Sequence, residues 1–261
     1  MHIKPKKRLG QNFLTDKNLQ NKIIDACGFE SSDIVLEIGA GRGELTQLIS
    51  PKVAVVFTLE IDSGLCEILK EKFEKSPNIK IINQNILKLN FKKYFSRIRK
   101  KIKVVGNIPY YITTPIIEYL LEAKDRIDII FITVQKEFAR RVTASPGSKD
   151  YGSLSCFLQY YTEPKMMFNI NKTCFYPAPK VDSCLLRLEV KQNISLNKSQ
   201  EKLVFKIIRA AFGKRRKTLR NSLKGTVPPN KLNKFFKKFG IDPNIRPERL
   251  SLSQFINLAK V

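Results

Sequence analysis

Short apolar runs of β type alternate with helical patterns over residues 31–135, and this alternation restricts the fold more than any other feature of the sequence. The apolar runs are Ile34–Ile38, Val53–Leu59, Ile79–Ile82, Ile102–Val105 and Ile127–Val134, and the helical patterns between them are Glu44–Ser50, Gly64–Phe73 and Pro115–Ala123. Such alternation is typical of βα units stacked around a mostly parallel sheet. Because the runs are almost continuously apolar, we expect this α/β sheet to be covered on both faces.

The pattern changes after about residue 191. Ser199–Phe212 and Asn230–Phe239 have the periodicity of amphipathic helices, with turn residues between and after them. Before this point, Met166–Ile170 and Ser183–Val190 are candidates for antiparallel strands at an edge of the sheet. We therefore expect two domains, residues 1–190 with the sheet and residues 191–261 as a small all-helical domain.

Positive charge is in large excess: 48 Lys and Arg against 23 Asp and Glu give a net charge of +25. Residues 196–249 hold 16 basic and 3 acidic residues, and residues 88–103 hold eight basic residues and no acid. Any one such run is most simply a solvated face, but together they favour a polyanionic partner. Nucleic acid is the first candidate and an acidic membrane surface the second.

Several classes of protein are excluded. The apolar runs are shorter than the roughly 20 residues that span a bilayer, and no apolar stretch follows the basic N-terminus as in a secretory signal. The five cysteines are widely spaced without a CxxC pair, which indicates reduced thiols and no metal site. The single histidine is His2, so a mechanism with a histidine base is excluded. We expect a monomeric, cytoplasmic protein that is not bound to a membrane.

A glycine-rich segment, Glu37–Gly43, follows a predicted strand and precedes a helix. Glycines at such a turn let the backbone approach a ligand closely. Glu60 ends the next strand, 19 residues after Gly41, where a carboxylate can accept hydrogen bonds from both hydroxyls of a ribose. These features fit a nicotinamide enzyme, an S-adenosylmethionine (SAM) enzyme or a plain tight turn, and the acid before the first glycine favours SAM.

A second motif, Asn107-Ile108-Pro109-Tyr110, lies at the end of another predicted strand, where open α/β sheets bind ligands. An exocyclic amine such as adenine N6 is a poor nucleophile, and it reacts only when acceptors hold its N–H groups. Asn107 offers a side-chain oxygen, Ile108 a backbone carbonyl and Tyr110 a ring that stacks on a base. Pro109 stiffens the turn. A sulfonium methyl group is already activated, so transfer needs no general base.

Four segments in this order resemble the rRNA adenine N6,N6-dimethyltransferase family: Leu9–Leu14, Glu37–Gly43, Asn107–Tyr110 and Phe175–Ser183. The resemblance covers nearly the whole chain and is closer to the bacterial KsgA enzymes than to the Erm methylases. It implies a Rossmann-like SAM-dependent methyltransferase sheet followed by a basic, RNA-binding helical domain. The substrate would be rRNA or a partly assembled small ribosomal subunit, dimethylated on two adjacent adenines near the 3′ end of the rRNA.

The resemblance also implies roles for individual residues. Asn12 and Leu14 would close over SAM, and Asn85 stands where the family has an adenine-binding Asp. Phe175 would stack on the target adenine opposite Tyr110. The implied cofactor-binding residues are Asn12, Leu14, Gly39, Gly41, Glu60, Asn85 and Asn107, the catalytic residues are Asn107, Ile108, Pro109, Tyr110 and Phe175, and the RNA-binding residues are Arg215, Arg216, Lys217 and Arg220. No metal is expected.

Two alternatives stay open. One is an Erm-like adenine N6-methyltransferase that acts on large-subunit rRNA. The other is a non-catalytic assembly factor that binds nucleic acid, which the intact Asn107–Tyr110 motif disfavours. A nicotinamide oxidoreductase is a more distant alternative, because it gives no reason for the basic charge.

Overall fold

The computed structural model describes residues 4–261 except 193, 195 and 215, and the chain divides into two compact units. The first unit runs to Ala139 and resumes over Lys165–Val190, and the second comprises Arg140–Pro164 and Lys191–Val261. Residues 140–164 thus group with the C-terminal helices, although they precede the boundary predicted at residue 190. Aromatic side chains hold them there, because Phe157 and Tyr161 pack their rings on Phe205.

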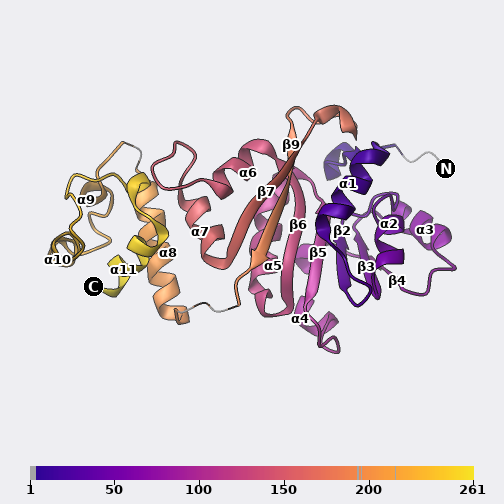
Figure 1. Ribbon diagram of the computed structural model, residues 1–261, viewed down its shortest axis with the longest axis horizontal. Coiled ribbons are helices and arrows are strands. Elements are labelled where there is room, and N and C mark those ends of the chain that lie inside the picture. Colours follow the sequence, from indigo (N-terminus) through magenta and orange to yellow (C-terminus); the bar gives the residue numbers. More distant parts are fainter. Residues whose placement is uncertain (1–3, 193, 195, 215) are drawn as a thin grey trace. The chain divides into compact units, whose positions relative to one another are not determined.

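The first unit is built on a seven-stranded sheet in the described part of the chain, with the order β4-β3-β2-β5-β6-β9-β7 (Figure 1). Its strands are β2 (Ile34–Ile38), β3 (Val55–Glu60), β4 (Ile79–Asn83), β5 (Ile102–Asn107), β6 (Ile127–Gln135), β7 (Thr162–Ile170) and β9 (Ser183–Val190). Neighbouring strands in the series β4, β3, β2, β5 and β6 are parallel, and β9 pairs antiparallel with β6. The predicted α/β fold class and the predicted strands are therefore confirmed.

Strand order reverses direction between β2 and β5, since β3 and β4 lie on one side of β2 and β5 lies on the other. At such a reversal the loops that follow the two neighbouring strands turn to opposite faces of the sheet, and they leave a crevice at the carboxyl ends. The segment after β2 is the glycine loop, and the segment after β5 is Ile108–Tyr110. The topology thus brings both predicted motifs to one crevice.

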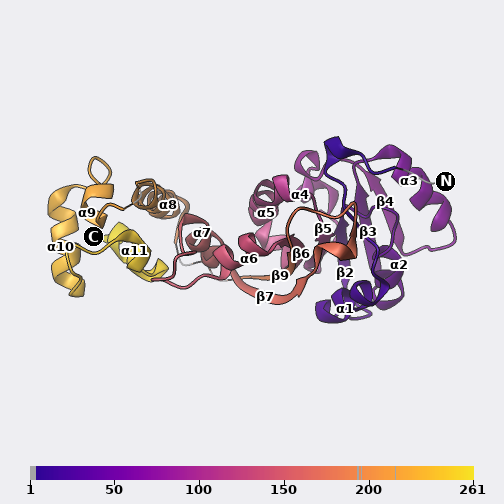
Figure 2. The same ribbon diagram turned by 90° about the horizontal axis from the view of Figure 1, so that it is seen from above.

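Helices cover both faces of the sheet, with α5 on one face and α1 and α2 on the other (Figure 2). The helices of this unit are α1 (Lys17–Cys27), α2 (Thr46–Ile49), α3 (Ser63–Lys72), α4 (Phe91–Tyr94), α5 (Thr113–Glu122) and the first part of α6 (Lys136–Thr143). Ile23 and Ile24 of α1 join Val35, Val105 and Phe131 of the sheet in one buried core cluster. This core fixes the strand ends from which the crevice is formed.

A separate two-stranded pair joins the N-terminal segment to the segment after β7. Phe13 and Leu14 form β1, which pairs antiparallel with β8, Phe175 and Tyr176. Leu14 lies opposite Phe175, and both side chains belong to the core cluster. The N-terminal segment is therefore held beside the crevice.

The second unit contains the helices α7 (Ser153–Tyr161), α8 (Lys198–Phe212), α9 (Leu219–Ser222), α10 (Pro229–Phe239) and α11 (Leu252–Lys260). The two longest, α8 and α10, correspond to the predicted amphipathic helices. The side chain of Asn197 caps α8 by accepting from the backbone N–H groups of Ser199 and Gln200, a contact that satisfies donors otherwise left open at a helix start. No helix among the described residues is long and apolar enough to cross a membrane.

A buried carboxyl group closes the glycine loop between β2 and α2. Glu37 is only 2% exposed, and it accepts a 2.5 Å hydrogen bond from the Thr46 hydroxyl at the start of α2. Burial raises the pKa of Glu37 to about 7, because it disfavours the charged form more than the Thr46 hydrogen bond favours it. The loop is thus closed by a group that the fold prefers to hold protonated.

We expect Glu37→Gln to stabilise the protein at pH 8 and to do so much less at pH 5. The pKa of Glu37 in the folded state lies above the unfolded value of about 4.3, so its ionisation destabilises the folded protein. This destabilisation grows as the pH rises from about 4.3 to about 7. Glutamine keeps an acceptor for Thr46 without the charge. The gain at pH 8 should be on the order of 2–4 kcal/mol in the free energy of unfolding, measured with urea.

The exposed Glu67 of α3 provides the control, since Glu67→Gln changes the same groups without burial. That variant should alter the free energy of unfolding little at either pH. An equal gain for Glu37→Gln at both pH values would show that its carboxyl does not titrate differently in the folded state.

Candidate active site

The glycine loop is held against the end of β3 by Glu60. Oε2 of Glu60 accepts from the backbone N–H of Gly41 at 2.9 Å, and Oε1 accepts from the backbone N–H groups of Ile61 and Asp62, each at 2.9 Å. Glu60 is 5% exposed, and burial raises its pKa despite these three hydrogen bonds. Gly41 has a φ of 60°, and a Cβ there would lie 3.1 Å from the Phe13 ring, so the position is suited to glycine.

A cavity lies over this loop, and it brings the two predicted motifs together with the N-terminal segment. Carboxyl, amide and apolar groups from the ends of four parallel strands share its wall. Every predicted cofactor-binding residue and the whole Asn107–Tyr110 motif line it: Asn12, Leu14, Gly39, Gly41, Glu60, Asn85, Asn107, Ile108, Pro109 and Tyr110.

The carboxamide of Asn107 is fixed by the N-terminal segment. Its Nδ2 donates to the backbone carbonyl of Asn12 at 2.8 Å. Because a carbonyl oxygen only accepts, the nitrogen of the carboxamide has to face Asn12, and Oδ1 is left as the acceptor on the other side. Gly39 keeps β5 close to the loop, since a Cβ at this position would lie 3.1 Å from the backbone oxygen of Asn107.

Tyr110 and Phe175, the two predicted stacking rings, lie in different surroundings. Tyr110 lines the cavity, its hydroxyl is 2.5 Å from the Ser183 hydroxyl, and burial raises its pKa. Phe175 is 3% exposed in the core cluster and is not among the residues that line the cavity. Alternation along β8 explains this, because Phe175 faces the core beside Leu14 and the next residue, Tyr176, is 60% exposed.

Asn85 lines the cavity and also begins a short 3₁₀ helix, Ile86–Lys88. Its Oδ1 accepts from the backbone N–H of Leu87 at 3.0 Å. The side chain that the resemblance implies for binding the adenine of SAM is thus already engaged once through its oxygen, although an amide oxygen has a second lone pair. Ile86 and Ile61 supply apolar surface on the same wall, and no sequence pattern indicated either residue.

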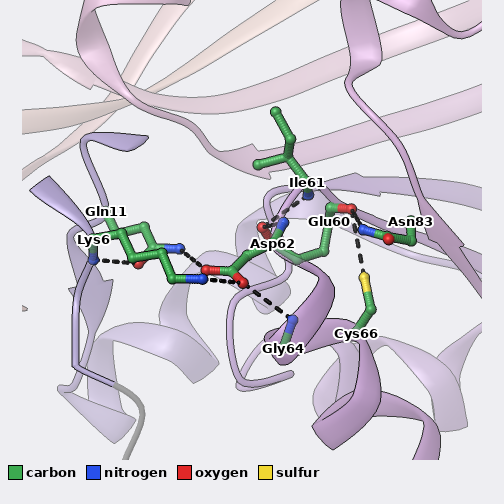
Figure 3. A network of polar contacts seen from close by, with 8 residues as sticks. All are labelled: Lys6, Gln11, Glu60, Ile61, Asp62, Gly64, Cys66 and Asn83. Carbon is green, nitrogen blue, oxygen red and sulfur yellow. Dashed lines mark hydrogen bonds and ion pairs between the residues drawn. The ribbon is translucent and has the colours of Figure 1, made fainter. Parts of the chain in front are cut away.

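A polar network that no sequence pattern indicated ties the N-terminal segment to the start of α3 (Figure 3). Asp62 accepts from Lys6 Nζ at 2.7 Å and from Gln11 Nε2 at 3.2 Å, and its Oδ1 caps α3 by accepting from the Gly64 N–H. Burial alone would raise the pKa of Asp62, but the bonds from Lys6 and Gln11 and the Lys6 charge outweigh it and lower the pKa. Asp62 before a helix indicates a cap in the sequence, but nothing there connects it to residues about fifty positions earlier.

The predicted RNA-binding residues belong to the second unit. Arg216 and Lys217 are exposed between α8 and α9. Arg220 donates to Asn233 Oδ1 at 2.9 Å, and its guanidinium lies 5.5 Å from the centre of the Phe236 ring on α10. Arg215 lies outside the described residues.

Comparison with known sequences matches almost the entire chain. The sequence profile of the family described as ribosomal RNA adenine dimethylase covers residues 2–261. The ribosomal RNA small subunit methyltransferase A of Caldanaerobacter subterraneus subsp. tengcongensis is 43% identical over 262 aligned residues, which cover 98% of this chain and 97% of that protein. The protein of the same description from Streptococcus pneumoniae is 39% identical and covers 97% and 90%, respectively.

Solved structures agree with the sequences. A dimethyladenosine transferase from Plasmodium falciparum superposes with a TM-score of 0.81 at 27% identity, covering 94% of this chain and 95% of that one. The 23S rRNA methyltransferase ErmE superposes with a TM-score of 0.77 at 26% identity, covering 95% and 98%. The resemblance stated from the sequence is confirmed: this chain belongs to the ribosomal RNA adenine dimethylase family of methyltransferase enzymes.

Proposed function

We propose that this chain uses SAM to dimethylate the N6 amines of two adjacent adenines near the 3′ end of small-subunit rRNA during ribosome assembly. It would act in the cytoplasm as a monomer, on free rRNA or a partly assembled small subunit. The observation that carries this proposal is the fixed carboxamide of Asn107, whose Oδ1 is left to accept an amine proton in the cavity lined by Glu60. The small-subunit substrate is supported by the descriptions of the full-length relatives at about 40% identity.

The residues of the cavity fit a nucleoside-bearing methyl donor. Glu60 presents a carboxylate at the end of β3, and its Oε2, which accepts only from Gly41 among the described residues, would accept from a ribose hydroxyl. Ile61 and Ile86 supply apolar surface for a base. Gly39 and Gly41 present backbone without side chains on the same wall. When bound, SAM supplies a methyl group on a positively charged sulfur, which makes that carbon an electrophile.

The Asn107–Tyr110 motif would prepare the adenine. The N6 lone pair is delocalised into the ring. The amine therefore gains nucleophilicity only when its two N–H groups are held so that the lone pair turns out of conjugation with the ring. Asn107 Oδ1 and the Ile108 carbonyl would accept hydrogen bonds from these two N–H groups while Tyr110 stacks on the ring. Amide and carbonyl oxygens hold an N–H without removing its proton, so the proton released after transfer leaves to solvent.

Two further assignments follow from where the side chains lie. We assign the stacking to Tyr110 and give Phe175 a supporting role, since it packs in the core beside Leu14. We assign rRNA phosphate contacts to the basic side chains of the second unit, Arg216, Lys217 and Arg220, because such contacts give affinity and register. Arg215 is proposed with them from the sequence alone.

The direct test incubates the protein with labelled SAM and separated, unmethylated small and large ribosomal subunits, followed by mapping of the modified bases. We expect dimethyladenine at two adjacent positions near the 3′ end of the small-subunit rRNA. Label in large-subunit rRNA would support the Erm-like alternative instead. Binding to subunits without any transfer would identify a non-catalytic assembly factor.

Asn107→Ala should reduce the single-turnover rate of methyl transfer by roughly 10²–10³-fold, because it removes one pre-aligned acceptor of the target amine. Folding should be unaffected by circular dichroism, since the Asn107 side chain is only partly buried. The matched control is Asn18→Ala on the exposed face of α1, which should leave the rate unchanged. A rate within threefold of the parent for Asn107→Ala would contradict the proposed role.

Glu60→Gln should weaken SAM binding at least about tenfold, measured by calorimetry, while RNA affinity changes little. The substitution replaces charge-assisted hydrogen bonds with neutral ones and places an NH₂ group among backbone donors. Glu67→Gln on α3 makes the same chemical change at an exposed position and should have no effect on SAM binding. Unchanged SAM affinity in Glu60→Gln would reject Glu60 as the ribose acceptor.

A further inference from the structure

The N-terminal segment Lys6–Leu14, here called the strap, is anchored on both sides of Asn12. On one side, Lys6 and Gln11 bind Asp62, and the Lys6 backbone N–H donates to Gln11 Oε1 at 2.8 Å (Figure 3). On the other side, Leu14 pairs with Phe175 in the two-stranded sheet. An N-terminal segment frays unless such contacts hold it. The strap is therefore held in place next to the cavity.

Asp62 is built as an anchor. Its side chain is fully buried, and its two oxygens accept from three donors, the Lys6 ammonium, the Gln11 amide and the Gly64 N–H of α3. The Lys6–Asp62 pair is charge-assisted at 2.7 Å, and the Asp62 end of it is shielded from water. The strap is thus attached to a fixed point at the start of a helix in the first unit.

The consequence of this anchor reaches the motif that holds the target amine. The carbonyl of Asn12, next to Gln11, is the acceptor that fixes the Asn107 carboxamide at 2.8 Å. Without that carbonyl, rotation about the terminal bond of Asn107 would exchange its NH₂ group and its oxygen. The NH₂ group would then meet the N–H groups of adenine N6, donor against donor, and the amine would not be held for attack.

We propose that Asp62 is a positioning residue for methyl transfer, which holds the strap through Lys6 and Gln11 so that the Asn12 carbonyl keeps Asn107 Oδ1 turned towards the target amine. This inference rests on the proposed function for its activity readout. Asp62 itself touches neither the amine nor Asn107. It acts through two hydrogen bonds, from Gln11 to Asp62 and from Asn107 to the Asn12 carbonyl, and both lie within the first unit.

The test breaks the anchor without disturbing the cap of α3, so the substitutions are made in the strap. Gln11→Glu replaces a donor to Asp62 with a carboxylate of the same shape, and Lys6→Met removes the ammonium. Lys6→Arg should rescue, because it restores a cation that reaches Asp62. Gln47→Glu on the exposed side of α2 is the matched control, since it adds the same charge away from the strap.

We expect Gln11→Glu and Lys6→Met to lower the single-turnover rate at saturating SAM and RNA by about 10- to 100-fold, as for a reacting group misplaced by about 1 Å. Gln47→Glu and Lys6→Arg should stay within threefold of the parent. In an Asn107→Ala background, Gln11→Glu should cost nothing further, because the group that the strap orients is gone. An equal loss in both backgrounds, or a parental rate in the single variants, would overturn the proposal.

A second readout is independent of activity. In the parent, the side-chain NH₂ of Asn107, assigned by its disappearance in Asn107→Ala, should show slow hydrogen exchange in ¹H–¹⁵N spectra, and Gln11→Glu should accelerate that exchange. Unaltered exchange would overturn the proposal. If the parent methylates no rRNA, the proposed function fails, but the exchange measurement still decides whether the strap sets the carboxamide.

Discussion

The arrangement of the cavity depends on the hydrogen bonds that the Glu60 carboxylate accepts. It accepts one backbone N–H from the glycine loop, at Gly41, and two from the turn that follows β3, at Ile61 and Asp62. Buried backbone donors without a partner cost about 1–3 kcal/mol each, so a loop and a turn that lack strand partners need such an acceptor. Two adjacent walls of the crevice are therefore joined by one side chain.

The turn after β3 connects this interaction to the rest of the site. Two residues beyond Glu60, Asp62 begins α3 and faces the strap instead of the loop. The strap then reaches Asn107 at the end of β5 through the Asn12 carbonyl. Three strand ends and the N-terminal segment are thus linked by hydrogen bonds at 2.7–3.2 Å, which explains how segments far apart in the sequence hold one geometry.

The sequence predicted the features that depend on a local pattern, and it did not predict those that depend on contacts between distant residues. The apolar runs predicted the strands of the sheet, because a run such as Ile127–Val134 is buried on both faces whatever lies beside it. The glycine motif and Asn107–Tyr110 were each predicted to follow a strand end, and the structure brings both to one cavity. The ion pair of Lys6 with Asp62 and the inward face of Phe175 depend on pairings across more than fifty residues, and no local pattern encodes those.

The chain as a whole is positively charged, whereas the wall of the proposed site carries acidic groups. The chain carries a net charge of +25, whereas the cavity wall holds the carboxyl groups of Glu44 and Glu60. A basic surface attracts RNA from a distance, and a cavity lined by carboxyl groups favours the cationic sulfur of a methyl donor over a phosphate. In the proposed function, the same carboxyl groups would oppose entry of the RNA backbone into the cavity but not entry of an uncharged base. In the proposed function, Asn107, Ile108 and Tyr110 would offer only neutral groups to that base, so its selection within the cavity would depend on hydrogen-bond geometry and not on charge.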